Sequence, residues 1–178
     1  MDNRIRNTYA EHSTAVLKNS LYDSYIRAIR WASDRIKDKG MICYVTNGSF
    51  IDSNTADGLR KCLTDEFSKI YCFNLRGNGR TSGETCRKEG HPLFAATGGK
   101  GGSLTPITIT LLIKNPEHKS ACELFYHDIG DYLSRKEKLE IIENFKGING
   151  ISWQKLTPNE SHDWINQRNE EFEGFISM

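Results

Sequence analysis

The sequence has no uninterrupted apolar run long enough to cross a bilayer as a helix. Its first residues, MDNRIRNTYAEHST, also lack the apolar core of a secretory signal peptide. These two absences predict a cytoplasmic protein that makes no membrane contact. The chain has 178 residues, of which 37% are hydrophobic and 26% charged, and these values are typical of one globular domain.

Closely spaced metal-ligating residues are absent as well. The five cysteines and five histidines are scattered, and no C-x-x-C pair occurs. A zinc site needs paired ligands at short spacing, so we expect no metal and interpret the cysteines as reduced, buried thiols. The formal net charge is only +1, so a nucleic-acid interface would have to be a local basic patch. The cysteines are Cys43, Cys62, Cys72, Cys86 and Cys122.

Apolar spacing indicates alternating helices and strands. Helices are predicted over 20–39, 56–67 and 134–145, with a weaker candidate at 158–171, and strands over 41–46, 70–73, 106–115 and 121–129. Ser20 with Asp23, and Ser134 with Glu137, have the spacing of capping boxes, and Gly40 is a natural helix stop. Helix–strand alternation favours an α/β fold around a largely parallel central sheet.

The strand at 41–46 runs directly into the small polar residues Thr46-Asn47-Gly48-Ser49. In open α/β sheets, ligands bind beyond the carboxyl ends of the strands, so this loop is placed to line a cleft. The alternative is a plain strand–helix turn in which Asn-Gly-Ser serves only turn chemistry. The spacing alone leaves both interpretations open.

A long glycine-rich gap separates the second and third predicted strands. Residues 76–105 include eight glycines, and we predict a loop without secondary structure, of the kind that is usually functional. Its basic residues, which include Lys100, outnumber its acidic ones and suit a phosphate backbone. Phe94 either anchors the loop to the core or offers a stacking surface to an unstacked base. The runs Gly77–Gly79 and Gly98–Ser103 are not nucleotide fingerprints, because no helix follows either directly.

The order of these segments resembles a known enzyme family. The run SLYDSYIRAIRWASDRIKDKGMICYVTNGSFIDSNTADGLRKCLTDEFSKIYCFNLRGN is similar to the gamma-class adenine-N6 DNA methyltransferases, and in particular to the methylase region of type ISP restriction-modification enzymes. The resemblance extends from about Arg4 to the Trp164–Arg168 stretch. It implies part of a Rossmann-like, S-adenosylmethionine-dependent methyltransferase sheet, its later strands and helices only, in a three-layer α/β/α arrangement.

The resemblance also implies roles for particular residues. The adenine ring of S-adenosylmethionine is expected against Leu21, Tyr22 and Tyr25, where the family has its cofactor-binding helix start. Asn47 and Phe50 match the loop that borders the active-site cleft, and Phe94 matches an aromatic that stacks on the flipped adenine. Contacts to the DNA backbone are expected from the basic residues of the loop, namely Arg76, Arg80, Arg87 and Lys88.

One family motif has no counterpart here. The catalytic Asn-Pro-Pro-Tyr motif, which holds the adenine amino group for attack on the methyl sulfonium, does not occur in the sequence. The resemblance therefore implies no catalytic residue in this chain, which alone should be inactive. Residues 1–146 would be the C-terminal half of the methylase domain, and 147–178 a linker or helix leading toward a target-recognition domain. The implied partners are double-stranded DNA and the N-terminal methylase half.

Two other functions are compatible with the sequence. One is a non-catalytic remnant, or an interaction module that pairs with a partner half. Such a module would leave a sheet edge exposed and would tend to self-associate through it. The other is a small nucleotide-binding α/β protein unrelated to methylation.

Overall fold

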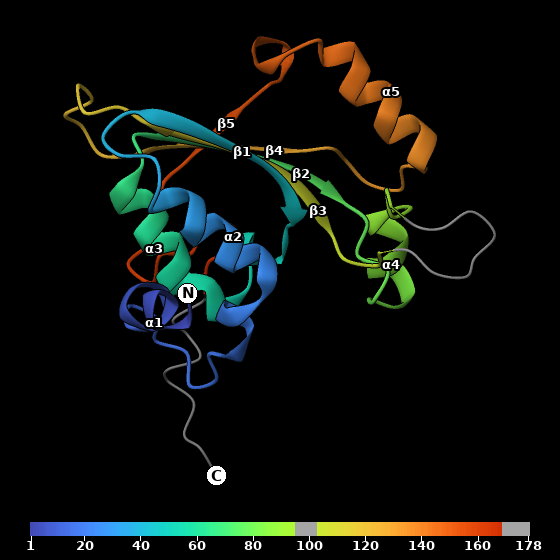
Figure 1. The fold of residues 1–178 in the computed structure, drawn as a ribbon. Helices are drawn as coiled ribbons and strands as arrows, with labels where there is room; N and C mark the ends of the chain where they lie inside the picture. The colour runs from blue at the N-terminus through green and yellow to red at the C-terminus, as the bar shows by residue number, and fades with distance from the viewer. Residues whose placement is uncertain (95–102, 169–178) are drawn as a thin grey trace.

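A computed structural model describes residues 1–94 and 103–168. Its centre is a five-stranded sheet in the order β1-β3-β2-β4-β5. The strands are β1 (Gly40–Asn47), β2 (Lys69–Arg76), β3 (Ile107–Lys114), β4 (Glu123–Asp128) and β5 (Gln154–Leu156). The first four confirm the strands predicted from the sequence. Helices cover both faces of the sheet, so the predicted α/β class and its three layers are confirmed (Figure 1).

The prediction of a largely parallel sheet was wrong. β3 lies between β1 and β2 and is antiparallel to both, β5 is antiparallel to β4, and only β2 and β4 pair in parallel. The reason lies in the segment between β2 and β3. Its described part holds only one short helix, and β3 pairs antiparallel with β2, so the chain enters β3 at the end of the sheet where β2 stops. β1, β2 and β4 still run the same way, so their carboxyl ends share one edge.

One face of the sheet is covered by α1 (Asp2–Ile5), α2 (Ser24–Ser33) and α3 (Asp57–Glu66). Figure 1 shows these helices below the sheet and α5 (Arg135–Phe145) above it. Ile42, Ile70, Leu112 and Leu124 point down into the larger of two hydrophobic cores. The smaller core lies on the other side, where Phe73 and Ile107 are buried and the apolar residues of α5 pack.

The long helix predicted over 20–39 is broken. A short 3-10 turn covers Asn19–Tyr22, Asp23 is extended with φ −60° and ψ 147°, and α2 ends at Ser33. The predicted Ser20–Asp23 capping box does not form, because the Ser20 hydroxyl bonds Thr55 instead. Gly40 begins β1 rather than ending a helix. The capping box of Ser134 and Glu137 is confirmed at the start of α5.

The glycine-rich gap and the tail also differ from expectation. The gap contains a helix, α4 (Gly83–Glu89), so the prediction of a structureless loop was wrong. Lys100 and most of the 98–103 run lie outside the described residues. In the tail, 158–168 form turns rather than a helix, and Trp164 is buried in the larger core. Residues 169–171 of that predicted helix are not described.

All five cysteines are free, but only Cys62 and Cys72 are buried, whereas Cys43 is exposed. Within the described residues no group of three or more metal-ligating side chains gathers. No helix there has both the length and the apolar character needed to cross a membrane.

Candidate cofactor pocket and nucleic-acid interface

A small pocket lies where β1 ends and α2 begins. A short turn joins α2 to β1, so the two run in opposite directions and the start of the helix meets the end of the strand. The pocket has a volume of about 160 Å³. Four separate stretches of the chain supply its lining: Ser20, Leu21, Asp23, Tyr25 and Ile26; Asn47, Ser49 and Phe50; Ser53, Thr55 and Ala56; and Arg80. Five residues singled out from the sequence therefore come together here: Leu21, Tyr25, Asn47, Phe50 and Arg80.

Apolar and aromatic side chains form part of the pocket wall. The ring centroids of Tyr25 and Phe50 are 6.4 Å apart, with planes inclined at 41°. Burial raises the pKa of Tyr25 above its ordinary value, so its hydroxyl stays protonated and can donate a hydrogen bond. Leu21 is fully buried. These groups suit a flat, partly apolar ligand.

Polar groups complete the pocket. The Oδ1 atom of Asn47 accepts hydrogen bonds from the Ser49 backbone N–H at 2.9 Å and the Ser49 hydroxyl at 2.7 Å. Asn47 therefore stabilises the turn after β1, as expected from the alternative in which this stretch is a plain strand–helix turn. The Thr55 hydroxyl lies 2.8 Å from that of Ser20 and 2.9 Å from that of Ser53. Sequence reasoning missed these hydroxyl groups, because scattered Ser and Thr residues carry no pattern until the chain folds.

Tyr22 is not part of this pocket. It lines a separate, open depression with Lys18 and with residues of the segment that follows α1, namely Arg6, Asn7, Ala10 and Glu11. The break at Asp23 explains the difference, because it changes the chain direction between Tyr22 and Tyr25. The three residues expected to bind the cofactor are therefore divided between two surfaces.

The four basic residues expected to contact DNA lie in different surroundings. Arg76 forms ion pairs with Asp128, at 2.7 Å, and with Asp131. These carboxylates neutralise its charge, so it holds the end of β2 in place. Arg80 lines the pocket and has no ion-pair partner among the described residues. Arg87 on α4 pairs with Glu84 one turn earlier, and Lys88 is exposed.

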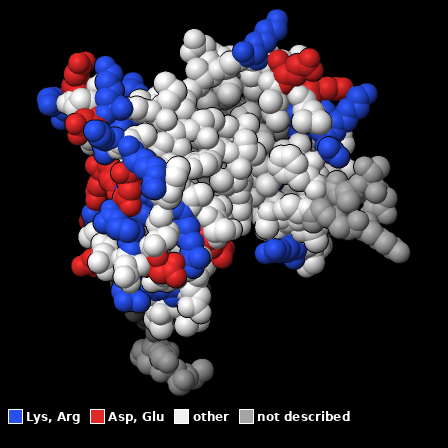
Figure 2. Space-filling view, in the orientation of Figure 1, with Lys and Arg blue, Asp and Glu red and all other residues white. Residues whose placement is uncertain are grey.

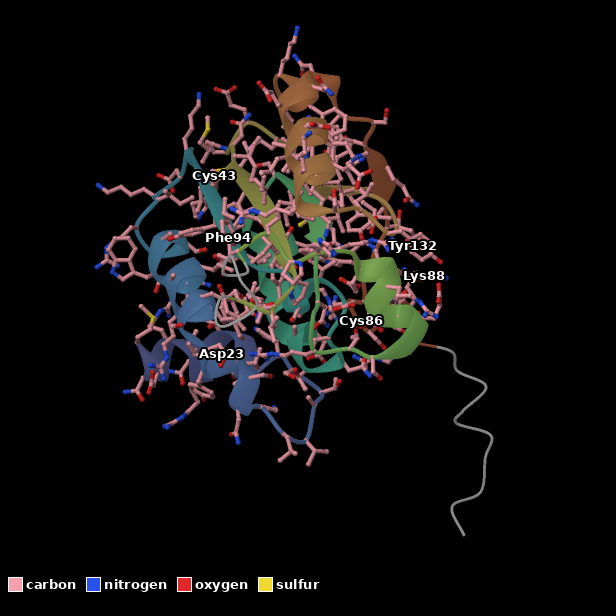
Figure 3. All side chains as sticks on the ribbon, turned by 90° about the vertical axis from the view of Figure 1, so that its right-hand side faces the viewer. Asp23, Cys43, Cys86, Lys88, Phe94 and Tyr132 are labelled. Atoms are coloured by element: carbon pink, nitrogen blue, oxygen red, sulfur yellow. The ribbon has the colours of Figure 1, made fainter. Side chains whose placement is uncertain are left out.

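Contacts from the loop after β4 and from α5 hold α4 in place. Figure 3 shows Cys86 and Lys88 on α4 with Tyr132 beside them, and Asp23 on the opposite side of that view. The Tyr132 hydroxyl donates to Glu84 at 2.6 Å, and its backbone N–H donates to the Lys88 carbonyl at 3.0 Å. The buried Lys138 amine donates to the carbonyls of Leu75 and Glu89, each at 2.9 Å. Burial lowers the pKa of Lys138 to about 8.

Phe94 is 55% exposed and its neighbour Leu93 is buried in the smaller core. Leu93 is thus the residue that anchors this stretch, and the Phe94 ring remains available to a partner. The backbone N–H of Ser103 donates to the Phe94 carbonyl at 3.1 Å, so the two ends of the undescribed 95–102 segment meet at this point. Phe94 does not line the pocket at the end of β1.

The face of β1 that points away from α1, α2 and α3 is apolar and exposed. Met41, Cys43 and Val45 alternate along the strand and are exposed, and within residues 1–94 and 103–168 β1 has a strand neighbour on one side only. Cys43 also lines an almost wholly apolar groove of about 310 Å³ between the sheet and α5. Figure 2 shows a broad uncharged area here, between the charged surfaces of α1–α3 and of α5. We call this surface, made by Met41, Cys43, Val45 and the groove, the β1 face.

Comparison with solved structures finds close likeness to restriction-modification enzymes. A nuclease-deletion mutant of the type ISP restriction-modification enzyme LlaGI, in complex with a DNA substrate mimic, is 46% identical over 98% of this chain, with a TM-score of 0.87. The ATP-dependent type ISP enzyme LlaBIII, bound to DNA, is 44% identical over 99% of the chain, with a TM-score of 0.91. DrdV in its complex with DNA is 34% identical over 96%, with a TM-score of 0.84.

This chain spans only 14%, 11% and 16% of those three proteins, respectively. It is thus similar, over nearly its whole length, to a short segment of two type ISP restriction-modification enzymes and of DrdV. No known protein-family profile matches the sequence. A search of curated proteins found no match either.

Proposed function

We propose that this chain is the segment of a type ISP restriction-modification enzyme that forms the C-terminal half of its adenine-N6 DNA methyltransferase domain. The observation that carries the proposal is the 44–46% identity to two type ISP enzymes over 98–99% of the chain. In this proposal the sheet belongs to a Rossmann-like methyltransferase fold that is completed by an N-terminal half. Double-stranded DNA is the substrate, and a flipped adenine receives the methyl group.

The pocket at the end of β1 supports a cofactor role. Leu21, Tyr25 and Phe50 offer an apolar wall to the adenine ring of S-adenosylmethionine, and the hydroxyl groups of Ser20 and Thr55 offer hydrogen bonds. Of the described residues, these are the ones that fit the adenosine part. The cofactor supplies the methyl group when it is bound, and this chain contributes one wall of its site.

Phe94 supports a role in holding the extruded base. Its exposed ring can stack on a flipped adenine, and Arg87 and Lys88 on α4 can meet the phosphate backbone. This chain contains no Asn-Pro-Pro-Tyr motif, so the group that orients the adenine amino nitrogen must come from outside it. We therefore expect the isolated chain not to transfer methyl groups.

The test is an exchange of segments. This chain replaces the matching segment of LlaGI, and transfer of labelled methyl groups from S-adenosylmethionine to adenine in DNA is measured. The exchanged enzyme is expected to be active, and Phe94→Ala should lower its transfer rate about tenfold, because base–aromatic stacking contributes about 1–3 kcal/mol per base. S-adenosylmethionine affinity should change less than twofold.

Trp31→Ala is the matched control, because Trp31 is an exposed aromatic on α2. It should leave both quantities unchanged. No methyl transfer by the exchanged enzyme before mutation would contradict the proposed function. Equal losses of transfer and cofactor affinity in Phe94→Ala would instead make Phe94 a structural anchor.

A second candidate function, an interaction module, is favoured by the β1 face. An edge strand of eight residues with exposed apolar side chains is a template for pairing with another strand. In the isolated chain we expect this edge to pair with a second copy, giving oligomers whose proportion rises with concentration in sedimentation experiments. Val45→Lys should weaken this association at least tenfold, because it places a charge on the edge strand.

Leu139→Lys is the control for this experiment. Leu139 is similarly exposed, at 49% against 55% for Val45, but it lies on α5 and away from the edge. It should leave the association unchanged. A monomer at all concentrations would rule out pairing through β1 in the isolated chain.

A further inference from the structure

Arg60 is a buried cation in the middle of α3. Its side chain is fully buried, and its guanidinium makes four hydrogen bonds. The Nη1 atom donates to the carbonyls of Phe50, at 3.0 Å, and Ser53, at 2.7 Å. One nitrogen therefore fixes both ends of the turn that brings the Phe50 ring to the pocket.

The other side of the guanidinium holds a segment more than a hundred residues later in the sequence. Its Nε donates to the His162 carbonyl at 2.7 Å, and its Nη2 donates to the buried carboxylate of Asp163 at 2.7 Å. That segment is itself closed into a turn, because the Asp163 backbone N–H donates to the Asn159 side chain at 2.8 Å. Arg60 thus joins the 50–53 turn to the 159–163 turn.

Trp164 continues the connection by direct packing. Its ring is buried and meets the Phe50 ring edge-on, with centroids 6.1 Å apart and planes at 78°. The Phe50 ring is therefore held between Trp164 on one side and Tyr25, across the pocket, on the other. Since the indole N–H has no acceptor among the described residues, this contact depends on the shape of the ring.

We propose that Arg60, Asp163 and Trp164 are positioning residues that hold Phe50 in place as a wall of the pocket. We call this set the brace. The proposal rests on the proposed function, because in it the pocket is the adenosine site. A buried ion pair is weak support for stability, since apolar side chains of similar size often replace one without loss. The two bonds to backbone carbonyls of the 50–53 turn point instead to control of geometry, on which ligand affinity depends.

If the brace holds Phe50 in place, its loss should weaken the binding of S-adenosylmethionine without unfolding the protein. The double variant Arg60→Met with Asp163→Leu removes both charges of the buried pair together, and the half-exposed Arg168 loses its 3.0 Å contact with the Asp163 carboxylate. The fold is expected to persist. Amide hydrogen exchange over residues 48–53 of this chain should become at least tenfold faster. In the LlaGI exchange enzyme, the KM for S-adenosylmethionine should rise about tenfold while kcat changes less than twofold.

Two further variants sharpen the experiment. Lys61→Met with Asp65→Leu removes an exposed ion pair from the same helix and should change neither exchange nor KM. Trp164→Leu leaves the groups that bond Arg60 in place and removes the aromatic edge together with part of the buried ring volume. It tests the brace even where the double variant does not fold. It too should raise the KM and leave kcat unchanged.

The outcomes separate the two proposals. Unchanged exchange over 48–53, or an unchanged KM in both brace variants, would overturn the brace. If the exchange enzyme binds no S-adenosylmethionine before mutation, the proposed function fails. Hydrogen exchange on this chain then still decides whether Arg60 and Trp164 fix the Phe50 turn.

Discussion

Gly58→Ala is expected to destabilise the fold more than any other single-methyl addition to the described part of the chain. A Cβ atom at Gly58 would lie 2.0 Å from the carbonyl oxygen of Tyr9 and 2.6 Å from the backbone nitrogen of Ser13. Both neighbours are backbone atoms of the N-terminal segment, so no side-chain rotation relieves the overlap. The two backbones would have to separate.

That separation would break a buried network next to Gly58. The Asp57 carboxylate accepts hydrogen bonds from the Ser13 hydroxyl at 2.5 Å, the Thr14 backbone N–H at 2.8 Å and the Thr14 hydroxyl at 2.6 Å. Burial acts to raise the pKa of Asp57, but these hydrogen bonds outweigh it and keep the pKa below its usual value. Moving the N-terminal segment away would remove three of the hydrogen bonds to this buried carboxylate and leave it the Gly58 backbone N–H, at 2.8 Å, and the Arg168 guanidinium, at 3.8 Å.

The expected free-energy contributions add up to a net loss of stability in Gly58→Ala. Alanine in a helix interior is better than glycine by about 0.5–1 kcal/mol. Overpacking typically costs about 1–3 kcal/mol, and an unsatisfied buried charged group adds about 1–3 kcal/mol or more. We therefore expect a net loss of about 3 kcal/mol, which corresponds to a fall in Tm of about 10 °C for a chain of this size.

Thermal unfolding followed by circular dichroism measures this effect. Gly147→Ala is the control, because no heavy atom lies within 4 Å of a Cβ at that position. It should leave the Tm within about 1 °C, since substitutions away from packed features change stability by about 0.5 kcal/mol or less. A Tm for Gly58→Ala equal to that of the control would show that α3 and the N-terminal segment are not packed as described.

Local patterns predicted the individual elements well and their arrangement poorly. β1 and β3 carry long apolar runs, and α5 begins with a capping box, so each is visible within a short window of sequence. The antiparallel insertion of β3 depends on how the chain returns after β2, which no local pattern encodes. The break at Asp23 was missed because the apolar spacing continues through it from Leu21 to Tyr25.

The pocket could be predicted only in part for the same reason. Asn47 follows a predicted strand, where α/β folds bind ligands. Leu21, Tyr25 and Phe50 were expected at the site only from the resemblance to type ISP methylases. Arg60 and Asp163 are charged residues in the interior, 103 positions apart, and nothing in the sequence links them. Arg76 stands among loop residues that suggest a DNA contact, but its carboxylate partners, Asp128 and Asp131, come from the end of β4 and the loop after it.

Gly90→Ala is expected to release α4 from the body of the protein. Gly90 ends α4 with φ +67° and ψ −169°, a region that is essentially confined to glycine and costs other residues about 1–3 kcal/mol. A Cβ there would also lie 2.3 Å from the carbonyl oxygen of Leu133. That same oxygen accepts the hydrogen bond of the His91 backbone N–H at 2.9 Å, so the methyl group must break the contact that joins the end of α4 to the loop after β4.

Limited proteolysis with trypsin reports this release directly, because Arg87 and Lys88 are cleavage sites within α4. A loss of about 2–3 kcal/mol in local stability should speed cleavage at these sites about thirtyfold or more, if opening is fast relative to cleavage. Gly83→Ala is the matched control: its φ is +62°, but no heavy atom lies within 4 Å of the added Cβ. It adds a Cβ at a positive φ without the clash, so its effect should be several times smaller. Equal acceleration in both variants would mean that the turn geometry alone, and not the contact with Leu133, keeps α4 in place.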